Sequence, residues 1–351
     1  MSVLHTPLCD LLGSRYPIIQ TAMGWVASAE LVAGSCNAGA FGFLAAAVMT
    51  PQEVDASIQR IKQLTDKPFG VNFHMFQPGA QEIVDLIVKH KVRAVSYGRG
   101  PDAATIKKLK DGGAVCIPTV GAVKHAQKAI QLGADAVVVQ GGEGGGHTGA
   151  VASSILLPQV LDAVQVPVVA AGGFRDGRGL AAALAYGAAG IAMGTRFLLT
   201  QESPVPEATK ARYIAADTGD VIVSEKLDGL PQRMILNETL RELERTGPLG
   251  LAWLAMRNGL AYRKLTGASI FGLMTSAWNM RKAQGLSFGQ TMMSANAPMM
   301  IQQAMVLGHP AQGILPSGQV AGAITDLPSC ADLVGSIVTQ AQARLAALAG
   351  A

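Results

Sequence analysis

The sequence predicts an α/β fold, a (β/α)8 TIM barrel that carries an inserted, mainly helical subdomain. Short apolar runs alternate with amphipathic helical patterns along the first 200 residues, at a spacing of about 20 to 30 residues. Eight such runs can be counted, and a chain of 351 residues suits one barrel with an insertion. An open doubly wound sheet is the competing topology, but no GxGxxG follows the first run, where a dinucleotide fold would place it.

The expected strands are rich in β-branched residues and follow one another in this order: Pro17–Met23, Ala40–Leu44, Phe69–Phe73, Ala94–Tyr97, Val115–Val120, Ala136–Gln140, Val168–Ala171 and Gly190–Met193. Amphipathic stretches between them predict helices at Pro51–Leu64, Gln81–His90, Ala103–Lys110 and Val123–Leu132. Thr50 before Pro51 is typical of a helix N-cap with proline in the first turn. We expect residues 1–202 and 316–351 to form the barrel, and 203–315 to form a helical insertion that covers the active face.

Composition and charge exclude several classes of protein. Hydrophobic residues make up 49% of the chain, yet no apolar run approaches the roughly 18 to 20 residues of a membrane span. The N-terminus lacks an export signal, so we expect a soluble, cytoplasmic protein. The net charge of +4 is too weak to indicate nucleic-acid binding. The four cysteines lack the spacing of a zinc site or a redox dithiol, which predicts buried free thiols and no metal: Cys9, Cys36, Cys116 and Cys330.

A histidine in a glycine run follows the sixth expected strand. The run is Gly141-Gly142-Glu143-Gly144-Gly145-Gly146-His147-Thr148-Gly149. Glycine lets the backbone approach a ligand closely, and histidine is the side chain that exchanges protons most readily near neutral pH. His147 is therefore a candidate catalytic acid or base on the barrel's active face. The alternative is a flexible surface loop with an incidental histidine.

Two further glycine signatures follow the seventh and eighth expected strands. In barrels, these loops commonly bind a phosphate through backbone N–H groups. The candidate phosphate ligands are Gly172, Gly173, Gly194 and Thr195. Tight turns between strand and helix would explain the same glycines without a ligand.

Several motifs together resemble one enzyme family: Pro17-Ile18-Ile19-Gln20 with Met23, Asn37-Ala38-Gly39-Ala40-Phe41-Gly42, Gly70-Val71-Asn72, the histidine loop, Ala171-Gly172-Gly173-Phe174, and Gly194-Thr195-Arg196-Phe197. The chain resembles the nitronate monooxygenase (2-nitropropane dioxygenase) family of FMN-dependent barrels from about residue 7 to 200, and again at Ser317-Gly318-Gln319. The resemblance implies a non-covalent FMN and makes His147 the catalytic histidine. It implies a phosphate site at the four residues above and further flavin contacts from Met23, Gly24, Asn72, Gln140, Gly145, Gly146 and Gln319.

The segment Met23-Gly24-Trp25-Val26-Ala27 departs from the nitronate monooxygenase pattern. It is closer to two relatives in the superfamily, the flavin-dependent enoyl-acyl carrier protein reductases and the flavoproteins of steroid C/D-ring breakdown. Both act on thioesters. The lysine that NADH:quinone reductases of the superfamily carry after the fifth strand is missing, since Pro118-Thr119-Val120-Gly121 stands there.

No acidic residue occurs between Glu244 and Asp326. The segment between them holds eight of the 14 methionines and six basic residues: Arg245, Arg257, Arg263, Lys264, Arg281 and Lys282. Adaptable apolar contacts with positive potential suit an acyl chain on a phosphorylated carrier. An ordinary helical insertion, with methionines in its core and solvated basic side chains, is the alternative.

These patterns predict an FMN-dependent oxidoreductase that acts on a small molecule. Oxidation of alkyl nitronates with O2 as co-substrate, to a carbonyl compound and nitrite, is the first hypothesis. Oxidation or reduction of an acyl thioester, with His147 exchanging a proton, is the second. A flavin-binding protein without turnover is a third. We expect Glu143 to be an orienting partner or a helix-end acceptor, and the oligomeric state stays open, with a dimer as one option.

Overall fold

The computed structural model of the protein describes residues 3–350 except 76, 99, 248, 252, 259–287, 294 and 295. The chain divides into two compact units. The barrel unit comprises Met1–Gly144, Gly149–Pro204 and Ile324–Ala351, and the second unit comprises Gly145–Thr148 and Val205–Ala323. The expected domain boundaries at residues 203 and 315, and the placement of an insertion over the active face, stay predictions.

The barrel unit is built on a parallel sheet in the order β5-β4-β3-β2-β1-β10-β9-β7-β6. Seven of the eight predicted strands are confirmed at their expected places, and the eighth, Val115–Val120, is divided into two short strands. Within the described residues, the strands are β1 (Ile18–Gln20), β2 (Phe41–Ala45), β3 (Gly70–Asn72), β4 (Ala94–Ser96), β5 (Val115–Cys116), β6 (Thr119–Val120), β7 (Val137–Gln140), β9 (Val168–Ala171) and β10 (Gly190–Met193).

One extended run, Val115–Val120, closes this sheet into a barrel. Pro118, which has no N–H to donate, divides the run into β5 and β6, and these two halves stand at opposite ends of the strand order. β5 pairs with β4 and β6 pairs with β7. The backbone N–H of Thr119 also donates to the carbonyl of Tyr97, just beyond β4, at 3.1 Å. The run therefore contacts both edges of the sheet, which confirms the (β/α)8 barrel and excludes the open doubly wound sheet.

Alternate side chains of the strands fill the barrel interior, as a closed parallel sheet requires. Phe41 and Phe43 lie edge to face with ring centroids 5.1 Å apart. A Cβ at Gly70 would lie 2.3 Å from the Phe43 ring, so glycine is needed on the neighbouring strand. The other members of this core include Ile19, Val138, Val169 and Ala192.

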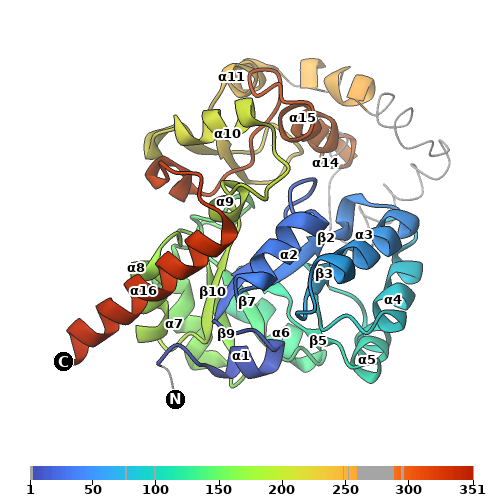
Figure 1. The fold of residues 1–351 in the computed structure, drawn as a ribbon. Helices are drawn as coiled ribbons and strands as arrows, with labels where there is room; N and C mark the ends of the chain where they lie inside the picture. Colours follow the sequence, from blue (N-terminus) through green and yellow to red (C-terminus); the bar gives the residue numbers. More distant parts are fainter. Residues whose placement is uncertain are drawn as a thin grey trace. The chain divides into compact units, whose positions relative to one another are not determined.

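Helices surround the strands in the barrel unit (Figure 1). They are α1 (Pro7–Leu12), α2 (Ala29–Asn37), η1 (Ala46–Val48), α3 (Pro51–Leu64), α4 (Ala80–Lys89), α5 (Ala103–Asp111), α6 (Val123–Gln131), α7 (Ser153–Ala163), α8 (Gly177–Ala185), α9 (Thr195–Leu198) and α16 (Cys330–Ala349). The four helices predicted from the sequence are confirmed to within a residue at each end. Thr50 and Glu53 form a reciprocal capping box at the start of α3, which fixes where that helix begins.

The C-terminal helix α16 packs closely on α8 within the barrel unit (Figure 1). The close approach depends on Gly177, the first residue of α8. A Cβ there would lie 2.4 Å from the backbone N of Ala341 and the carbonyl of Ile337. The backbone N–H of Gly177 donates to the Gln340 amide at 3.1 Å, so α16 is bonded to the start of α8.

The second unit combines helices with an antiparallel sheet in the order β11-β12-β8. Its elements within the described residues are β8 (Gly146–His147), α10 (Glu207–Ile214), η2 (Thr218–Asp220), β11 (Val221–Ser224), β12 (Gln232–Ile235), α11 (Glu238–Arg245), α14 (Phe288–Met293), α15 (Asn296–Met305) and η3 (Gln319–Ala323). Leu227, Met234, Leu240, Leu243 and Ile314 form its core, against which Met293 and Met300 pack. No helix among the described residues is long and apolar enough to cross a membrane.

Candidate active site

The turn after β9 presents two consecutive glycines in left-handed backbone conformations. Gly172 has φ = 97° and Gly173 has φ = 83°, values that L side chains rarely adopt. Among the hydrogen bonds between described residues, none uses the backbone N–H of either glycine. A Cβ at Gly173 would meet only the Glu143 side chain, at 3.7 Å. The turn therefore offers two backbone donors in a place that an anion could approach.

Glu143 and Ser153 hold this turn in place. The Ser153 hydroxyl donates to the Glu143 carboxylate at 2.8 Å and lies 3.1 Å from the carbonyl of Gly172. The backbone N–H of Ser153, the first residue of α7, also donates to both carboxylate oxygens of Glu143, at 3.0 and 3.2 Å. This confirms the interpretation of Glu143 as a helix-end acceptor.

The loop after β1 meets the loop after β10, the strand that pairs with β9. A Cβ at Gly194 would lie 3.1 Å from the Thr21 hydroxyl and 3.4 Å from the Met23 sulfur. Trp25, two residues after Met23, has φ = 61°, an uncommon conformation for a bulky residue and a sign of local constraint. Gly24 lies in the loop after β1 and Thr195 begins α9 directly after Gly194, so the structure brings these predicted site residues to one end of the strands.

Asn72 and Gln140 stand at the last positions of β3 and β7. The Asn72 amide donates to the Ser96 carbonyl at 3.0 Å, which orients the side chain across to β4. A Cβ at Gly144 would lie 2.6 Å from the Gln140 amide, so glycine is required where the histidine loop crosses that side chain. Both residues are therefore at the carboxyl ends of barrel strands, where TIM-barrel enzymes place their sites.

The histidine run, expected to be one loop, is divided between the two units. Gly141–Gly144 belong to the barrel unit, whereas Gly145–Thr148 belong to the second unit and include strand β8. A Cβ at Gly145 would lie 2.5 Å from the backbone N of Gly318, so this glycine packs against the chain just before Gln319. Gln319 is half-buried at the start of η3. Gly145, Gly146, His147 and Gln319 thus share the second unit.

His147 is held by two residues that the sequence analysis did not identify. β8 pairs with β12, with His147 opposite Gln232. The His147 Nε2 atom lies 2.8 Å from Asp228 Oδ2, and the Gln232 amide donates to the same oxygen at 2.6 Å. The other Asp228 oxygen accepts from the backbone N–H of Leu230 at 3.1 Å. Asp228-Gly229, a turn signal between two strand-like runs, is the feature that could have revealed this carboxylate.

The burial of this cluster is asymmetric. The Asp228 side chain is 7% exposed, whereas the His147 side chain is 59% exposed. A carboxylate can only accept hydrogen bonds, so the Gln232 amide and the His147 Nε2 group both donate to Asp228. The Gln232 amide nitrogen also lies 3.3 Å from His147 Nε2. The carboxylate is therefore an orienting partner of the imidazole.

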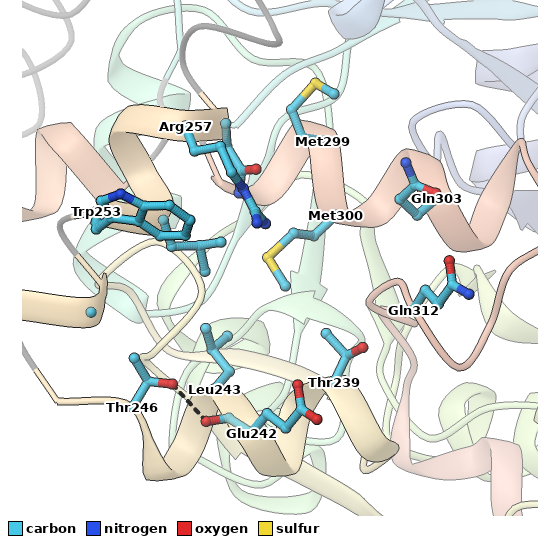
Figure 2. Close-up of a pocket in the computed structure, with 13 residues that line it drawn as sticks. Thr239, Glu242, Leu243, Thr246, Trp253, Arg257, Met299, Met300, Gln303 and Gln312 are labelled. Carbon is cyan, nitrogen blue, oxygen red and sulfur yellow. Dashed lines mark hydrogen bonds between the residues drawn. The ribbon is translucent and has the colours of Figure 1, made fainter.

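A cavity of about 670 Å³ lies within the second unit. Figure 2 shows Thr239, Glu242 and Leu243 of α11 along one side, with Trp253, Arg257 and Met300 facing them. Of the basic residues predicted to bind a carrier, Arg257 lines this cavity and Arg245 is exposed at the end of α11. The others lie outside the described residues: Arg263, Lys264, Arg281 and Lys282.

All four cysteines are free and buried, as predicted. Burial raises the pKa of Cys36 to about 12 and that of Cys330 to about 12, in the latter with the charge of Glu202 adding to the effect. Burial, with Asp135 nearby, raises the pKa of Cys116 to about 11. These thiols are therefore neutral near physiological pH and unsuited to nucleophilic catalysis.

Comparison with known proteins places the chain in a family. A family model described as nitronate monooxygenase matches residues 5–84 and 74–340. A protein of Rhodococcus jostii (strain RHA1), named (3aS,4S,5R,7aS)-5-hydroxy-7a-methyl-1-oxo-octahydro-1H-indene-4-carboxyl-CoA dehydrogenase, is 50% identical over 348 residues, which cover 99% of this chain and 99% of that protein. A probable nitronate monooxygenase of Staphylococcus saprophyticus is 32% identical over 287 residues, which cover 68% of this chain and 81% of that protein.

Among solved structures, FabK from Thermotoga maritima is similar with a TM-score of 0.81 and 29% identity, covering 99% of both chains. The resemblance drawn from the motifs is therefore confirmed. Nitronate oxidation, the first hypothesis, corresponds to the more distant relatives, whereas the thioester hypothesis corresponds to the name of a relative that matches almost the whole chain. The chain is an oxidoreductase that belongs to the nitronate monooxygenase family.

Proposed function

We propose that this protein is an FMN-dependent dehydrogenase of a bicyclic carboxyl-CoA thioester. The observation that carries the proposal is the 50% identity to a CoA-thioester dehydrogenase over 99% of both chains. A match of that extent includes the second unit, with Asp228 and Gln232, as well as the barrel. The nitronate monooxygenase relative, by contrast, covers 68% of this chain.

The barrel unit fits a flavin mononucleotide. The phosphate would bind at the backbone donors of Gly172 and Gly173, of which Gly173 leaves ordinary contact space around its backbone, and at Gly194 and Thr195 where α9 begins. Asn72 and Gln140 at the carboxyl ends of their strands, with Met23 and Gly24 in the loop after β1, would contact the ring. One phosphate site without a dinucleotide fingerprint supports FMN over FAD.

A bound flavin would accept a hydride from the substrate. The protein's own contribution is acid–base chemistry by His147. With Nε2 held by Asp228 at 2.8 Å, the imidazole of His147 is oriented to take a proton from a substrate carbon, and a thioester carbonyl makes the adjacent C–H more acidic. Asp228 stabilises the imidazolium that results, as an orienting carboxylate does in other acid–base pairs. Gly145 and Gly146 contribute backbone that a substrate can approach closely.

The test is anaerobic mixing of the purified yellow protein with a synthetic hydroindane carboxyl-CoA thioester. We expect the absorbance of the oxidised flavin to be lost and the thioester to be converted to a product with two fewer hydrogen atoms. The free acid without coenzyme A is the matched control and should react far more slowly. A thioester that leaves the flavin oxidised, in protein shown to contain FMN, would refute the proposal.

Oxidation of alkyl nitronates is a second candidate, favoured by the relative named as a probable nitronate monooxygenase. In that case O2 is the co-substrate, and His147 would stabilise the anionic substrate or take the proton of a neutral nitroalkane. The same preparation should then release nitrite from an alkyl nitronate in air. Efficient nitrite release, together with no reaction of the thioester, would favour this candidate.

A further inference from the structure

The cavity in the second unit has walls of mixed chemistry. Trp253 is 57% exposed, and the Arg257 guanidinium carbon lies 5.2 Å from the centroid of its ring. Met300 supplies a polarisable apolar surface, while Gln303 and Glu242 supply an amide and a carboxylate. The cavity therefore offers an aromatic face, a fixed cation and hydrogen-bonding groups of both kinds (Figure 2).

A second observation concerns the amides in and behind one wall. Asn258 lines the cavity and donates to the Asn296 side-chain oxygen at 2.9 Å. Asn296 is fully buried, and its Nδ2 group has no partner among the described residues. A buried amide donor without an acceptor is costly, but Asn296 itself does not line the cavity, so the group that this pair offers to a ligand is the Asn258 amide, which the bond to Asn296 positions.

An adenine nucleotide uses each of these groups. Adenine stacks on aromatic side chains and is read along its edge by amide groups. The exocyclic amine of adenine can donate to a carboxylate such as Glu242, and a phosphate pairs with a guanidinium such as Arg257. A purely apolar ring system would leave the charged groups without partners, and inorganic phosphate alone would leave the Trp253 face unused.

We propose that this cavity binds the adenosine 3′-phosphate end of coenzyme A, an inference that rests on the proposed thioester substrate. The location supports it. α11 begins at Glu238, three residues after β12, which carries Gln232 beside His147. Leu227, next to Asp228, and Leu243, which lines the cavity, belong to one hydrophobic core. The cavity and the His147 cluster are thus parts of the same compact unit.

The test compares two thioesters of one acid, the coenzyme A thioester and the pantetheine thioester, in Trp253→Ala and Arg257→Ala. We expect the preference for the coenzyme A thioester, measured as the ratio of the two kcat/KM values, to fall about 10-fold or more in each variant, since a stacked base or a paired phosphate is lost. Met256→Ala is the matched control. Met256 is also 57% exposed and lies on the same helical stretch, but it does not line the cavity.

A binding measurement separates this inference from the proposed function. Adenosine 3′,5′-bisphosphate should bind the wild-type holoenzyme in calorimetry, more weakly as salt rises, and should lose affinity in both variants. Loss of binding in the variants upholds the cavity even if neither thioester reduces the flavin, a result that would refute only the proposed function. Equal binding of the bisphosphate by all proteins, or an unchanged preference between the thioesters, would overturn the inference.

Discussion

Asp228→Asn removes the charge that orients His147 while keeping the shape of the side chain. In the structure, one carboxylate oxygen accepts from both His147 and Gln232, and the other accepts from Leu230. An asparagine has one oxygen and one NH2 group. If its oxygen faces His147 and Gln232, the bond to the backbone N–H of Leu230 is lost. If its oxygen faces Leu230, its NH2 group faces the donors of His147 and Gln232, and neither of those bonds can form.

The magnitude follows from the hydrogen bonds that change. A hydrogen bond to a charged group contributes roughly 1.5 to 3 kcal/mol, about twice a neutral bond. If at least one such bond to His147 is lost, the correctly oriented imidazole is less populated by that free energy, which corresponds to roughly a 10- to 150-fold fall in kcat/KM. His147→Asn should lower turnover by roughly 100-fold or more, the scale for removing a positioned acid or base.

The assay is flavin reduction by the thioester under anaerobic conditions, with flavin content measured for each variant. A nitrogen NMR spectrum of labelled histidine adds a readout that a merely structural role would not change. The wild-type signal of His147, identified by its absence in His147→Asn, should show the proton on Nε2, and Asp228→Asn should mix the two tautomers. Asp102→Asn is the matched control, because Asp102 is the N-cap of α5 and asparagine caps as well as aspartate.

An Asp228→Asn protein that binds flavin and retains activity within about twofold, while His147→Asn does not, would refute the orienting role. Loss of the wild-type fold in Asp228→Asn, seen as lost flavin and altered circular dichroism, would show that the carboxylate is needed for the second unit itself. In that case Gln232→Glu, which keeps the strand pairing but places a second carboxylate beside Asp228, should still perturb the tautomer of His147 if the orienting role holds.

Three further predictions follow from the glycines and the thiols. Gly173→Ala should weaken FMN affinity, measured by ultrafiltration. Gly187→Ala is the control, because Gly187 also has a positive φ and open space around it, and it should carry backbone strain without loss of FMN. Equal FMN affinities in the two variants would mean that the phosphate binds elsewhere. Gly177→Ala should lower the unfolding free energy, measured by denaturant titration, by about 1 to 3 kcal/mol because its Cβ meets the α16 backbone. Gly335→Ala, in open space on α16, should raise the unfolding free energy by about 0.5 to 1 kcal/mol. The opposite order of the two effects would contradict the packing of α16 on α8. The thiols of the native protein should not react with a thiol reagent until the protein is denatured. Burial raises the pKa of Cys36 to about 12, so the contribution of this thiol to stability is fully present below the ordinary thiol pKa of 9.0 and is lost as pH rises toward 12. An unfolding free energy that stays constant across that pH range would contradict the burial.

The sequence by itself determined the barrel and the order and places of its strands. Each unit of the barrel is signalled by neighbouring residues, a short β-branched run followed by an amphipathic stretch, so the pattern is readable locally. The capping box at Thr50 and the glycine turn at Gly172 and Gly173 are local for the same reason, since a cap or a positive φ depends on adjacent residues. Even the helix-end role of Glu143 could be expected, because its partner Ser153 is only ten residues away.

The tertiary structure decided what surrounds the catalytic candidate. Asp228 and Gln232 lie 81 and 85 residues from His147 in the chain and reach it through the pairing of β8 with β12. The closure of the barrel through Val115–Val120 is likewise a contact between distant strands. Local periodicity states which face of a segment is buried, but it does not state which distant segment covers that face, because strand register is set by the packing of the whole sheet. The sequence therefore did not identify Asp228 and Gln232 as the residues that orient His147, and only the tertiary structure showed them together.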